Sequence, residues 1–251
     1  MRIAYIVLTC ELYEKTRKVW QEETVFGGVP REDVYYLGHV MRPSDRLFSW
    51  GAADDYRSLP YKFVDFFLHW DKERAEDDYD WYFLMDDDTY LYVDRLKRRV
   101  EGLGVDPRTE PYVEGHLMTH VAHTEWGVYP SGGAGTLLSL AAIQGIRRRL
   151  RGMVRGGATY TAPHWCADIC VGRWTAGMRV VHADEYHTEM SPVAGRKGVI
   201  VRRREEKEDA DLALTFHHLK TKDDFWAHWL LGKRAEAEAE EEKREEAGAG
   251  S

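Results

Sequence analysis

Three consecutive aspartates are the residues whose type and position most directly predict chemistry in this sequence. Asp86, Asp87 and Asp88 follow the apolar run Trp81–Met85, which is typical of a buried strand. Carboxylates gathered at a strand end repel one another unless a cation lies among them. A hard divalent ion such as Mg²⁺ or Mn²⁺ binds one or two carboxylates together with phosphate oxygens. The pattern therefore favours a metal site over a solvated acidic turn.

A glycine-rich turn, Ser131–Gly135, is the second candidate. Gly132 and Gly133 allow the backbone to approach a ligand closely, and we predict that the turn opens a helix over Leu137–Leu150 and exposes its first amides. Asp168 lies near the start of a further predicted helix. Taken alone, it is explained equally well as a charge that stabilises a helix N-terminus.

Histidines supply the third candidate. His217 and His218 end a predicted strand, as the aspartates do, so a histidine there could complete a metal site begun by Asp88. Another group has the helical spacing of a zinc site, and it consists of His116, His120 and His123. The segment Val113–Val121 also reads as extended, and no acidic partner for those imidazoles lies nearby, so we do not predict zinc there.

The elements that must position these residues alternate between strands and helices. The predicted strands are Arg2–Thr9, Val34–Leu37, Trp81–Met85, Tyr90–Val93, Met178–His182 and Leu212–Phe216. The predicted helices are Leu12–Glu23, Tyr61–Ala75, Leu137–Leu150, one from about Ala167, and a closing helix with Trp226, Trp229 and Leu230 on one face. Leu47–Pro60 reads as a loop. The alternation predicts an α/β fold whose mostly parallel sheet is flanked by helices, with ligands at the carboxyl ends of strands.

Charge is concentrated at the C-terminus. The chain of 251 residues has a net charge of −8, and residues 235–251 hold seven Glu against one Lys and one Arg, so the rest carries only −3 (−8 minus −5). A body with so little net charge does not predict a nucleic-acid partner. We predict one domain over residues 1–233 and an acidic, disordered tail over 234–251.

The sequence contains no apolar stretch long enough for a membrane span and no signal peptide. Three cysteines, at 10, 166 and 170, cannot form a disulfide framework. These features favour a soluble protein of a reducing compartment such as the cytoplasm.

In this order, the motifs resemble glycosyltransferase family 31, the fringe-like and core 1 β1,3-galactosyltransferase-like enzymes. The matching segments are DWYFLMDDDTYLYVDRL (80–96), YPSGGAGTLLS (129–139), ADICVGR (167–173), EYHTE (185–189) and DLALTFHHLK (211–220). The pair Arg17 and Trp20 also resembles a basic residue and Trp that follow the first strand in that family. The resemblance spans about residues 2 to 230.

The resemblance implies a GT-A fold, a Rossmann-like nucleotide-sugar transferase. It implies that Mn²⁺ is held by Asp86, Asp88 and His217, with His187 as the alternative histidine, and that Asp168 is the catalytic base. It places Thr9, Arg17, Asp86, Asp87, Gly132 and Gly133 around the donor. The implied reaction passes a hexose, galactose before N-acetylglucosamine, from a UDP-sugar to a glycan or glycoprotein hydroxyl with inversion and forms a β1,3 linkage.

Departures from the family pattern keep a second function open. Ala167 stands where relatives carry an acid beside the catalytic aspartate, and the cysteines of secretory, usually Golgi-luminal relatives are largely missing. A non-catalytic nucleotide-sugar or carbohydrate-binding relative is therefore the alternative. A haloacid dehalogenase-type phosphatase fits less well, because Tyr90 stands where that family has Thr or Val.

Overall fold

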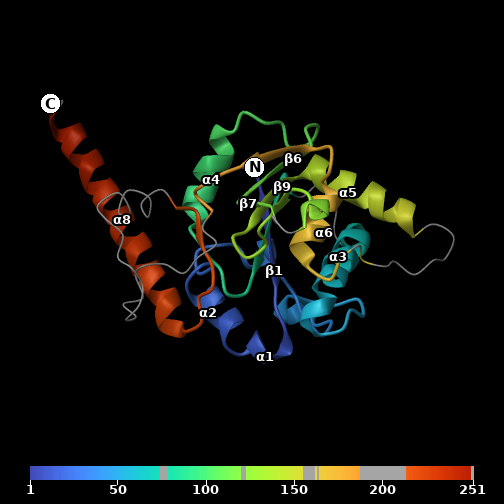
Figure 1. Cartoon of the computed structure of the whole chain (residues 1–251). Coiled ribbons are helices and arrows are strands. Elements are labelled where there is room, and N and C mark those ends of the chain that lie inside the picture. Colours follow the sequence, from blue (N-terminus) through green and yellow to red (C-terminus); the bar gives the residue numbers. More distant parts are fainter. Residues whose placement is uncertain (74–78, 120–122, 155–161, 163, 187–212, 250–251) are drawn as a thin grey trace.

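A seven-stranded sheet with the strand order β10-β6-β9-β4-β1-β2-β3 forms the centre of the molecule (Figure 1). The computed structural model describes residues 1–73, 79–119, 123–154, 162, 164–186 and 213–249. In chain order the sheet strands are β1 (Ile3–Leu8), β2 (Val34–Leu37), β3 (Leu47–Phe48), β4 (Trp81–Asp86), β6 (Tyr112–Gly115), β9 (Thr136–Ser139) and β10 (Arg179–His182). β9 runs antiparallel to β4 and β6, and the other neighbours are parallel. The predicted α/β fold with a mostly parallel central sheet is confirmed.

Helices cover both faces of this sheet. The longer helices are α2 (Arg17–Glu23), α3 (Leu59–Glu73), α4 (Val93–Gly102), α5 (Leu140–Met153), α6 (Ala167–Trp174) and α8 (Lys222–Ala249), and α1 (Glu11–Glu14) is a single turn. Short 3₁₀ turns are η1 (Arg31–Asp33), η2 (Pro43–Asp45), η3 (Tyr56–Ser58) and η5 (Thr124–Trp126). The described residues also form two small antiparallel ribbons, β5 (Tyr90–Leu91) with β11 (Thr215–Phe216) and β7 (Leu117–Met118) with β8 (Tyr129–Pro130).

The alternation of side chains along the strands creates two apolar cores. Along β1, Tyr5 and Val7 belong to the core shared with α4 and α8, whereas Ile6 belongs to the core shared with α3, α5 and α6. Figure 1 shows α3, α5 and α6 on one side of the sheet and α4 and α8 on the other. Strands buried on both faces are continuously apolar, which is why β1, β2 and β4 were visible in the sequence.

The helix predicted at Tyr61–Ala75 is present as α3. Its side chains Phe63, Phe66 and Phe67 are buried, as the helical spacing predicts. The loop predicted before it contains β3 and η3, and α3 begins two residues earlier than predicted, at Leu59. The predicted helix Leu12–Glu23 is divided near Thr16 into α1 and α2.

Two predicted elements differ from the structure. The glycine turn Ser131–Gly135 leads into strand β9 rather than a helix, and α5 begins only at Leu140, where the Ser139 side chain caps it. The extended piece predicted at Tyr90–Val93 ends at Leu91, and α4 begins at Val93. Both errors arose at short apolar runs, where strand and helix patterns are hardest to separate.

The C-terminal helix also differs from the prediction. Its buried side chains include Phe225 and His228, and Trp229 packs against the same core, whereas Leu230 is exposed, so the buried face matches the predicted one only in part. α8 continues to Ala249 through the segment predicted to be a disordered tail, and Figure 1 shows it extending away from the body. Ala, Glu, Lys and Arg have high helix propensity, which supports a helix without a core to bury. Among the described helices, none combines the length and the apolar character needed to cross a membrane.

Candidate active site

The aspartates and the glycine turn meet at one edge of the sheet because β9 is antiparallel. In the register of the sheet, Leu8 pairs with Asp86 and Leu84 pairs with Thr136. The carboxyl ends of β1 and β4 therefore lie beside the beginning of β9, and the turn that precedes β9 sits at the same edge. This topology brings Thr9, the three aspartates and Gly132–Gly135 together, although they are far apart in the sequence.

His217 reaches the same edge through the β5–β11 ribbon. Phe216 pairs with Tyr90, so the residue after β11 lies next to the residues before β5. The backbone amide of Leu219 donates to the carbonyl oxygen of Asp88 at 2.9 Å, which fixes the segment after His217. The side chain of Gln21, in α2, donates to the carbonyl oxygens of Asp86 (3.1 Å) and Thr89 (2.9 Å). These two hydrogen bonds tie the turn that carries the aspartates to α2.

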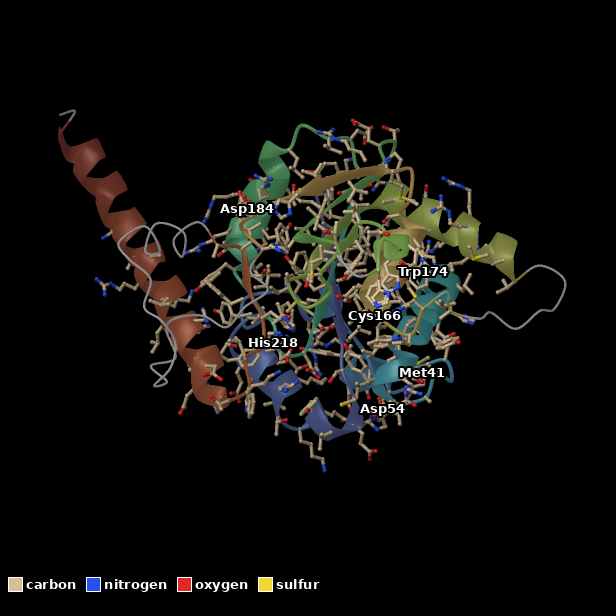
Figure 2. The ribbon with its side chains drawn as sticks, in the orientation of Figure 1. Met41, Asp54, Cys166, Trp174, Asp184 and His218 are labelled. Carbon is tan, nitrogen blue, oxygen red and sulfur yellow. The ribbon has the colours of Figure 1, made fainter. Side chains whose placement is uncertain are left out.

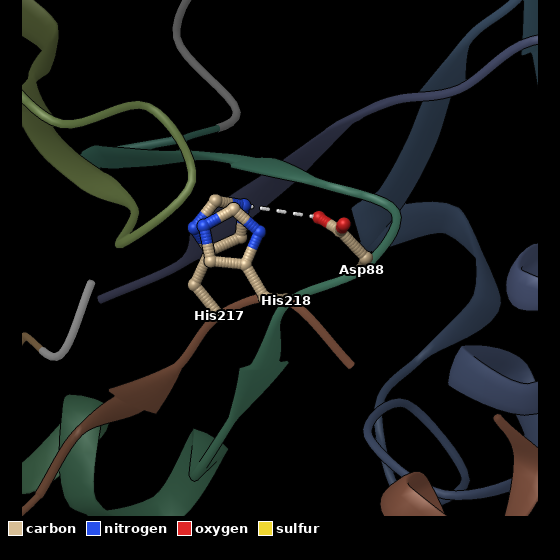
Figure 3. A group of neighbouring side chains, drawn as sticks. All are labelled: Asp88, His217 and His218. Carbon is tan, nitrogen blue, oxygen red and sulfur yellow. Dashed lines mark ion pairs between the residues drawn. The ribbon is translucent and has the colours of Figure 1, made fainter. Parts of the chain in front are cut away.

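Asp88 and the two histidines form a compact group of possible metal ligands (Figure 3). His217 Nε2 lies 3.1 Å from Asp88 Oδ1 and 3.9 Å from Asp86 Oδ2. One ligand atom from each of Asp88, His217 and His218 lies within 4.8 Å of the others. The two imidazole rings stack with centroids 3.7 Å apart, and His218 has a left-handed backbone (φ 65°). Carboxylate oxygen with imidazole nitrogen suits several divalent ions, Mn²⁺ and Zn²⁺ among them, so these residues fit a metal.

Positive groups surround Asp88. Burial alone would raise the pKa of its carboxyl, but hydrogen bonds and charge from His217 and Lys220 lower that pKa well below the usual range. Lys220 Nζ forms an ion pair with Asp88 Oδ2, and Arg17 lies 3.5 Å from the same oxygen. Asp88 is therefore ionised at neutral pH.

Asp87 is held by α2 and β1. It accepts hydrogen bonds from Thr9 Oγ1 and from an Arg17 nitrogen, both at 2.9 Å. The Arg17 guanidinium also lies 3.7 Å from the centroid of the Tyr13 ring. Burial nevertheless raises the pKa of Asp87. These contacts give Thr9 and Arg17 a definite role in positioning Asp87.

The two adjacent glycines each face a different chemical group. A Cβ at Gly132 would lie 2.5 Å from Asp168 Oδ1, and a Cβ at Gly133 would lie 2.0 Å from the His217 ring. Thr89 Oγ1 donates to the Gly133 carbonyl at 2.7 Å, and Thr215 Oγ1 donates to the Ala134 carbonyl at 2.6 Å, so the turn is held between β5 and β11. A side chain at 132 would therefore displace Asp168, and a side chain at 133 would displace His217.

Asp168 and Asp86 share an environment that opposes ionisation. Burial raises the pKa of Asp168, while the Gly132 amide and the charge of His217 act in the opposite direction. Desolvation, followed by the charges of Asp168, Asp88 and Asp87, raises the pKa of Asp86 well above its usual value. Asp168 lies in the first turn of α6, as predicted. A carboxylate whose pKa is raised by burial is a stronger base than one in water.

The structure thus brings the predicted residues together, and it adds others. Thr9, Arg17, Asp86, Asp87, Asp88, Gly132, Gly133, Asp168 and His217 all lie at this edge of the sheet. His218 and Lys220 belong to the same cluster, and the sequence offered no signal for Lys220 beyond its closeness to the histidines. Asp86 lies near His217 but outside the group of three possible ligands. The alternative ligand His187 lies outside the described residues.

The other histidine group does not converge in the described part of the chain. His116 packs against His182 with ring centroids 5.0 Å apart, whereas His123 stacks on Trp126 and contacts Glu125. His120 lies outside the described residues. Cys10, Cys166 and Cys170 carry free thiols.

Comparison with known proteins identifies the fold. A glycosyltransferase involved in the glycosylation of the major capsid of PBCV-1 aligns over 91% of this chain and 99% of its own, with 15% identity and a TM-score of 0.48. The galactosyltransferase LgtC, in complex with donor and acceptor sugar analogs, aligns over 88% and 87%, with 12% identity and a TM-score of 0.48. The bifunctional glycosyltransferase WbbM aligns over 91% of this chain and 49% of its own, with 10% identity and a TM-score of 0.51.

The fold is that of a GT-A glycosyltransferase. The likeness to WbbM carries this assignment, and this chain spans about half of that protein. At such low identity the likeness concerns the fold alone. No protein-family profile matches the sequence, and no curated protein matches it. Membership of glycosyltransferase family 31 therefore stays a prediction.

Proposed function

We propose that this protein is a metal-dependent glycosyltransferase that passes a hexose from a UDP-sugar to a sugar hydroxyl with inversion. One observation carries the proposal: Asp168 lies against Gly132, and His217, which pairs with Asp88, lies against the adjacent Gly133. Such a transfer needs a base for the acceptor and positive charge for the leaving diphosphate, held a short distance apart.

Asp168 is the proposed base. Its raised pKa makes the carboxylate a better proton acceptor, and the Gly132 amide helps to orient it. In a single displacement, the acceptor hydroxyl oxygen forms a bond to the anomeric carbon while its proton passes to Asp168. The bond between that carbon and the diphosphate oxygen breaks, so an α-linked donor gives a β-linked product without a covalent intermediate.

The opposite side of the glycine turn receives the diphosphate in this proposal. Asp88 and His217, with Asp86 and His218 beside them, would hold a divalent ion, Mn²⁺ by preference. Such an ion would supply positive charge to the departing diphosphate. Lys220 and Arg17, which contact Asp88, add two fixed cations at the same place. Thr9 and Arg17 hold Asp87 where the end of β1 would receive the nucleotide.

Donor and linkage follow from the sequence resemblance rather than from geometry. The segment DLALTFHH is more core 1-like than fringe-like, so UDP-galactose is the first donor and UDP-N-acetylglucosamine the second, with a β1,3 linkage. The acceptor would be a glycan or glycoprotein. The catalytic unit would span residues 1–233.

The test is donor hydrolysis by the purified protein across a panel of UDP-sugars, with Mn²⁺ and then with EDTA. We expect UDP to be released from one sugar in Mn²⁺ only, because water can replace the acceptor slowly. UDP binding without turnover over a broad acceptor panel would support the alternative, a non-catalytic nucleotide-sugar-binding protein. Absence of both turnover and UDP binding would refute the proposal.

A further inference from the structure

Five aromatic rings form a continuous row beside the proposed base. The ring pairs, with their centroid distances, are His123–Trp126 at 4.2 Å, Trp126–His164 at 4.8 Å, His164–Trp165 at 5.2 Å and Trp165–Tyr56 at 5.9 Å. They come from three separate segments: η5, the residues before α6, and η3. We call these five residues the aromatic row.

The row is exposed to solvent at both ends, at His123 and at the pair Trp165 and Tyr56. Trp165 is 53% exposed and Tyr56 is 66% exposed, which is unusual for two large rings in contact. Two large exposed rings side by side offer a contact surface for a ligand. Neither ring belongs to either apolar core.

Local hydrogen bonds fix the loops that present these rings. The Cys166 amide donates to His164 Nδ1 at 2.9 Å, and Cys170 Sγ donates to the His164 carbonyl at 3.1 Å. On the other side of the row, Asp55 accepts from the amide of Ser58 at 3.0 Å and caps η3, which carries Tyr56. The row is therefore a prearranged surface and not a set of free side chains.

The row lies next to Asp168. Figure 2 labels Cys166, the N-cap of α6. Trp165 directly precedes Cys166 in the chain, and Asp168 is in the first turn of α6. In the other segment, partial burial raises the pKa of the Tyr56 phenol, and the electrostatic influence of Cys166, Asp168, Asp86 and Asp88 raises it further. Tyr56 therefore lies close enough to these carboxylates to interact with them. A ligand resting on Trp165 and Tyr56 would lie beside the first turn of α6, which carries Asp168.

The chemistry of the row matches a pyranose. One face of such a ring carries C–H groups that pack on aromatic faces, whose electron density is negative, while its hydroxyls remain free for hydrogen bonds. Partial burial, followed by the influence of Arg173 and the neighbouring His123, lowers the pKa of His164, so this imidazole is neutral at pH 7 and presents an uncharged face. Glu125 contacts His123 at the end of the row away from Tyr56, and its carboxylate can accept a hydrogen bond from a sugar hydroxyl.

We propose that the aromatic row, chiefly Trp165 and Tyr56, stacks against a pyranose ring of the acceptor and delivers its hydroxyl to Asp168. This inference rests on the proposed function, because only a transfer to a sugar hydroxyl needs an acceptor ring beside Asp168. It commits to an uncharged glycoside as the occupant.

The experiment uses the full chain and saturation-transfer NMR with a panel of methyl glycosides of galactose, glucose and N-acetylglucosamine, in UDP and Mn²⁺. We expect at least one glycoside to receive saturation on its C–H face. Trp165→Ala should weaken that binding by about tenfold or more, as removal of a central aromatic contact does. Trp165→Phe should restore part of it, and Tyr56→Phe should bind like the wild type, because the ring and not the hydroxyl makes the contact.

Leu230→Ala is the matched control, since Leu230 is 59% exposed on α8, outside the row. The thermal unfolding midpoint of each variant shows that it is folded. If wild-type protein hydrolyses a UDP-sugar yet no glycoside binds, or if Trp165→Ala binds as the wild type does, the aromatic row is not the acceptor surface and the proposed function still stands. If UDP-sugar hydrolysis and UDP binding are both absent, the proposed function fails separately.

Discussion

The glycine at 133 offers the sharpest structural test of the proposed site. A Cβ there would lie 2.0 Å from Cε1, 2.2 Å from Nε2 and 2.4 Å from Nδ1 of His217. Ordinary contact begins at 3.4 Å, so in Gly133→Ala the imidazole must retreat by about 1.4 Å (3.4 minus 2.0). A misplacement of that size typically costs about 100-fold in rate, and we expect that loss in turnover.

The assay is UDP release from UDP-galactose with Mn²⁺ varied. Because His217 would lie among the metal ligands, Gly133→Ala should raise the Mn²⁺ concentration for half-maximal rate as well as lower the rate. In the companion variant Gly132→Ala, the new Cβ would lie 2.5 Å from Asp168 Oδ1, so the rate should fall with little change in Mn²⁺ dependence. The two neighbouring substitutions thus separate the metal side from the base side.

Gly102→Ala is the control, because a Cβ at this position in α4 meets nothing within 4 Å. Backbone strain does not explain the expected loss, since Gly135 and not Gly133 has the left-handed conformation (φ 90°). Wild-type rate and wild-type Mn²⁺ dependence in a folded Gly133→Ala protein would show that His217 has no part in the reaction.

Three further substitutions test other parts of the site and the fold. Asp168→Asn should lower turnover by about 100-fold or more while UDP binding, measured by calorimetry, is kept. Because burial raises the pKa of Asp168, the wild-type rate should fall as pH drops through that pKa. Substantial turnover by the Asn variant would contradict the role of Asp168 as base. Asp88→Ala should abolish turnover together with the Mn²⁺-dependent rise in unfolding temperature, and a retained rise would place the metal elsewhere. His228 is buried beside Tyr92, and burial lowers its pKa to about 4. Its folded pKa lies below the ordinary value of about 6.5, so the folded state binds fewer protons than the unfolded chain, and stability should fall by about 3 kcal/mol as pH drops from about 6.5 to 4. In urea unfolding, His228→Phe should remove this component, and parallel pH profiles for the two proteins would refute the assignment.

Several parts of the site followed from the sequence because short-range patterns determine them. β1, β2 and β4 are buried on both faces, so their apolar runs stand out, and the aspartates follow β4 directly. Asp168 begins a helix whose start was predictable from the local sequence. These patterns predict an α/β fold and several candidate reactive residues. Each of those residues also has an ordinary structural explanation when it is considered alone.

Local patterns failed where several arrangements bury the same residues. The run Thr136–Leu150 is apolar enough for strand or helix, and the partners of β9 in the sheet decide where one ends and the other begins. α4 buries only Leu96 and Val100 among charged neighbours, and an apolar stripe that narrow does not predict a helix from the sequence alone. α8 shows the same limit, since its buried face depends on Tyr90, Tyr92 and Phe216 around His228.

The tertiary structure alone decided that these residues form one site. More than a hundred positions separate Asp88 from His217 in the chain, and the β5–β11 pairing brings them to 3.1 Å. The antiparallel direction of β9 turns Gly132 and Gly133 toward Asp168 and His217, a contact that no spacing in the sequence encodes. Residue types determine what chemistry is available, because side-chain chemistry is local. Strand direction and register determine which groups meet, because they depend on the free energy of packing the whole sheet.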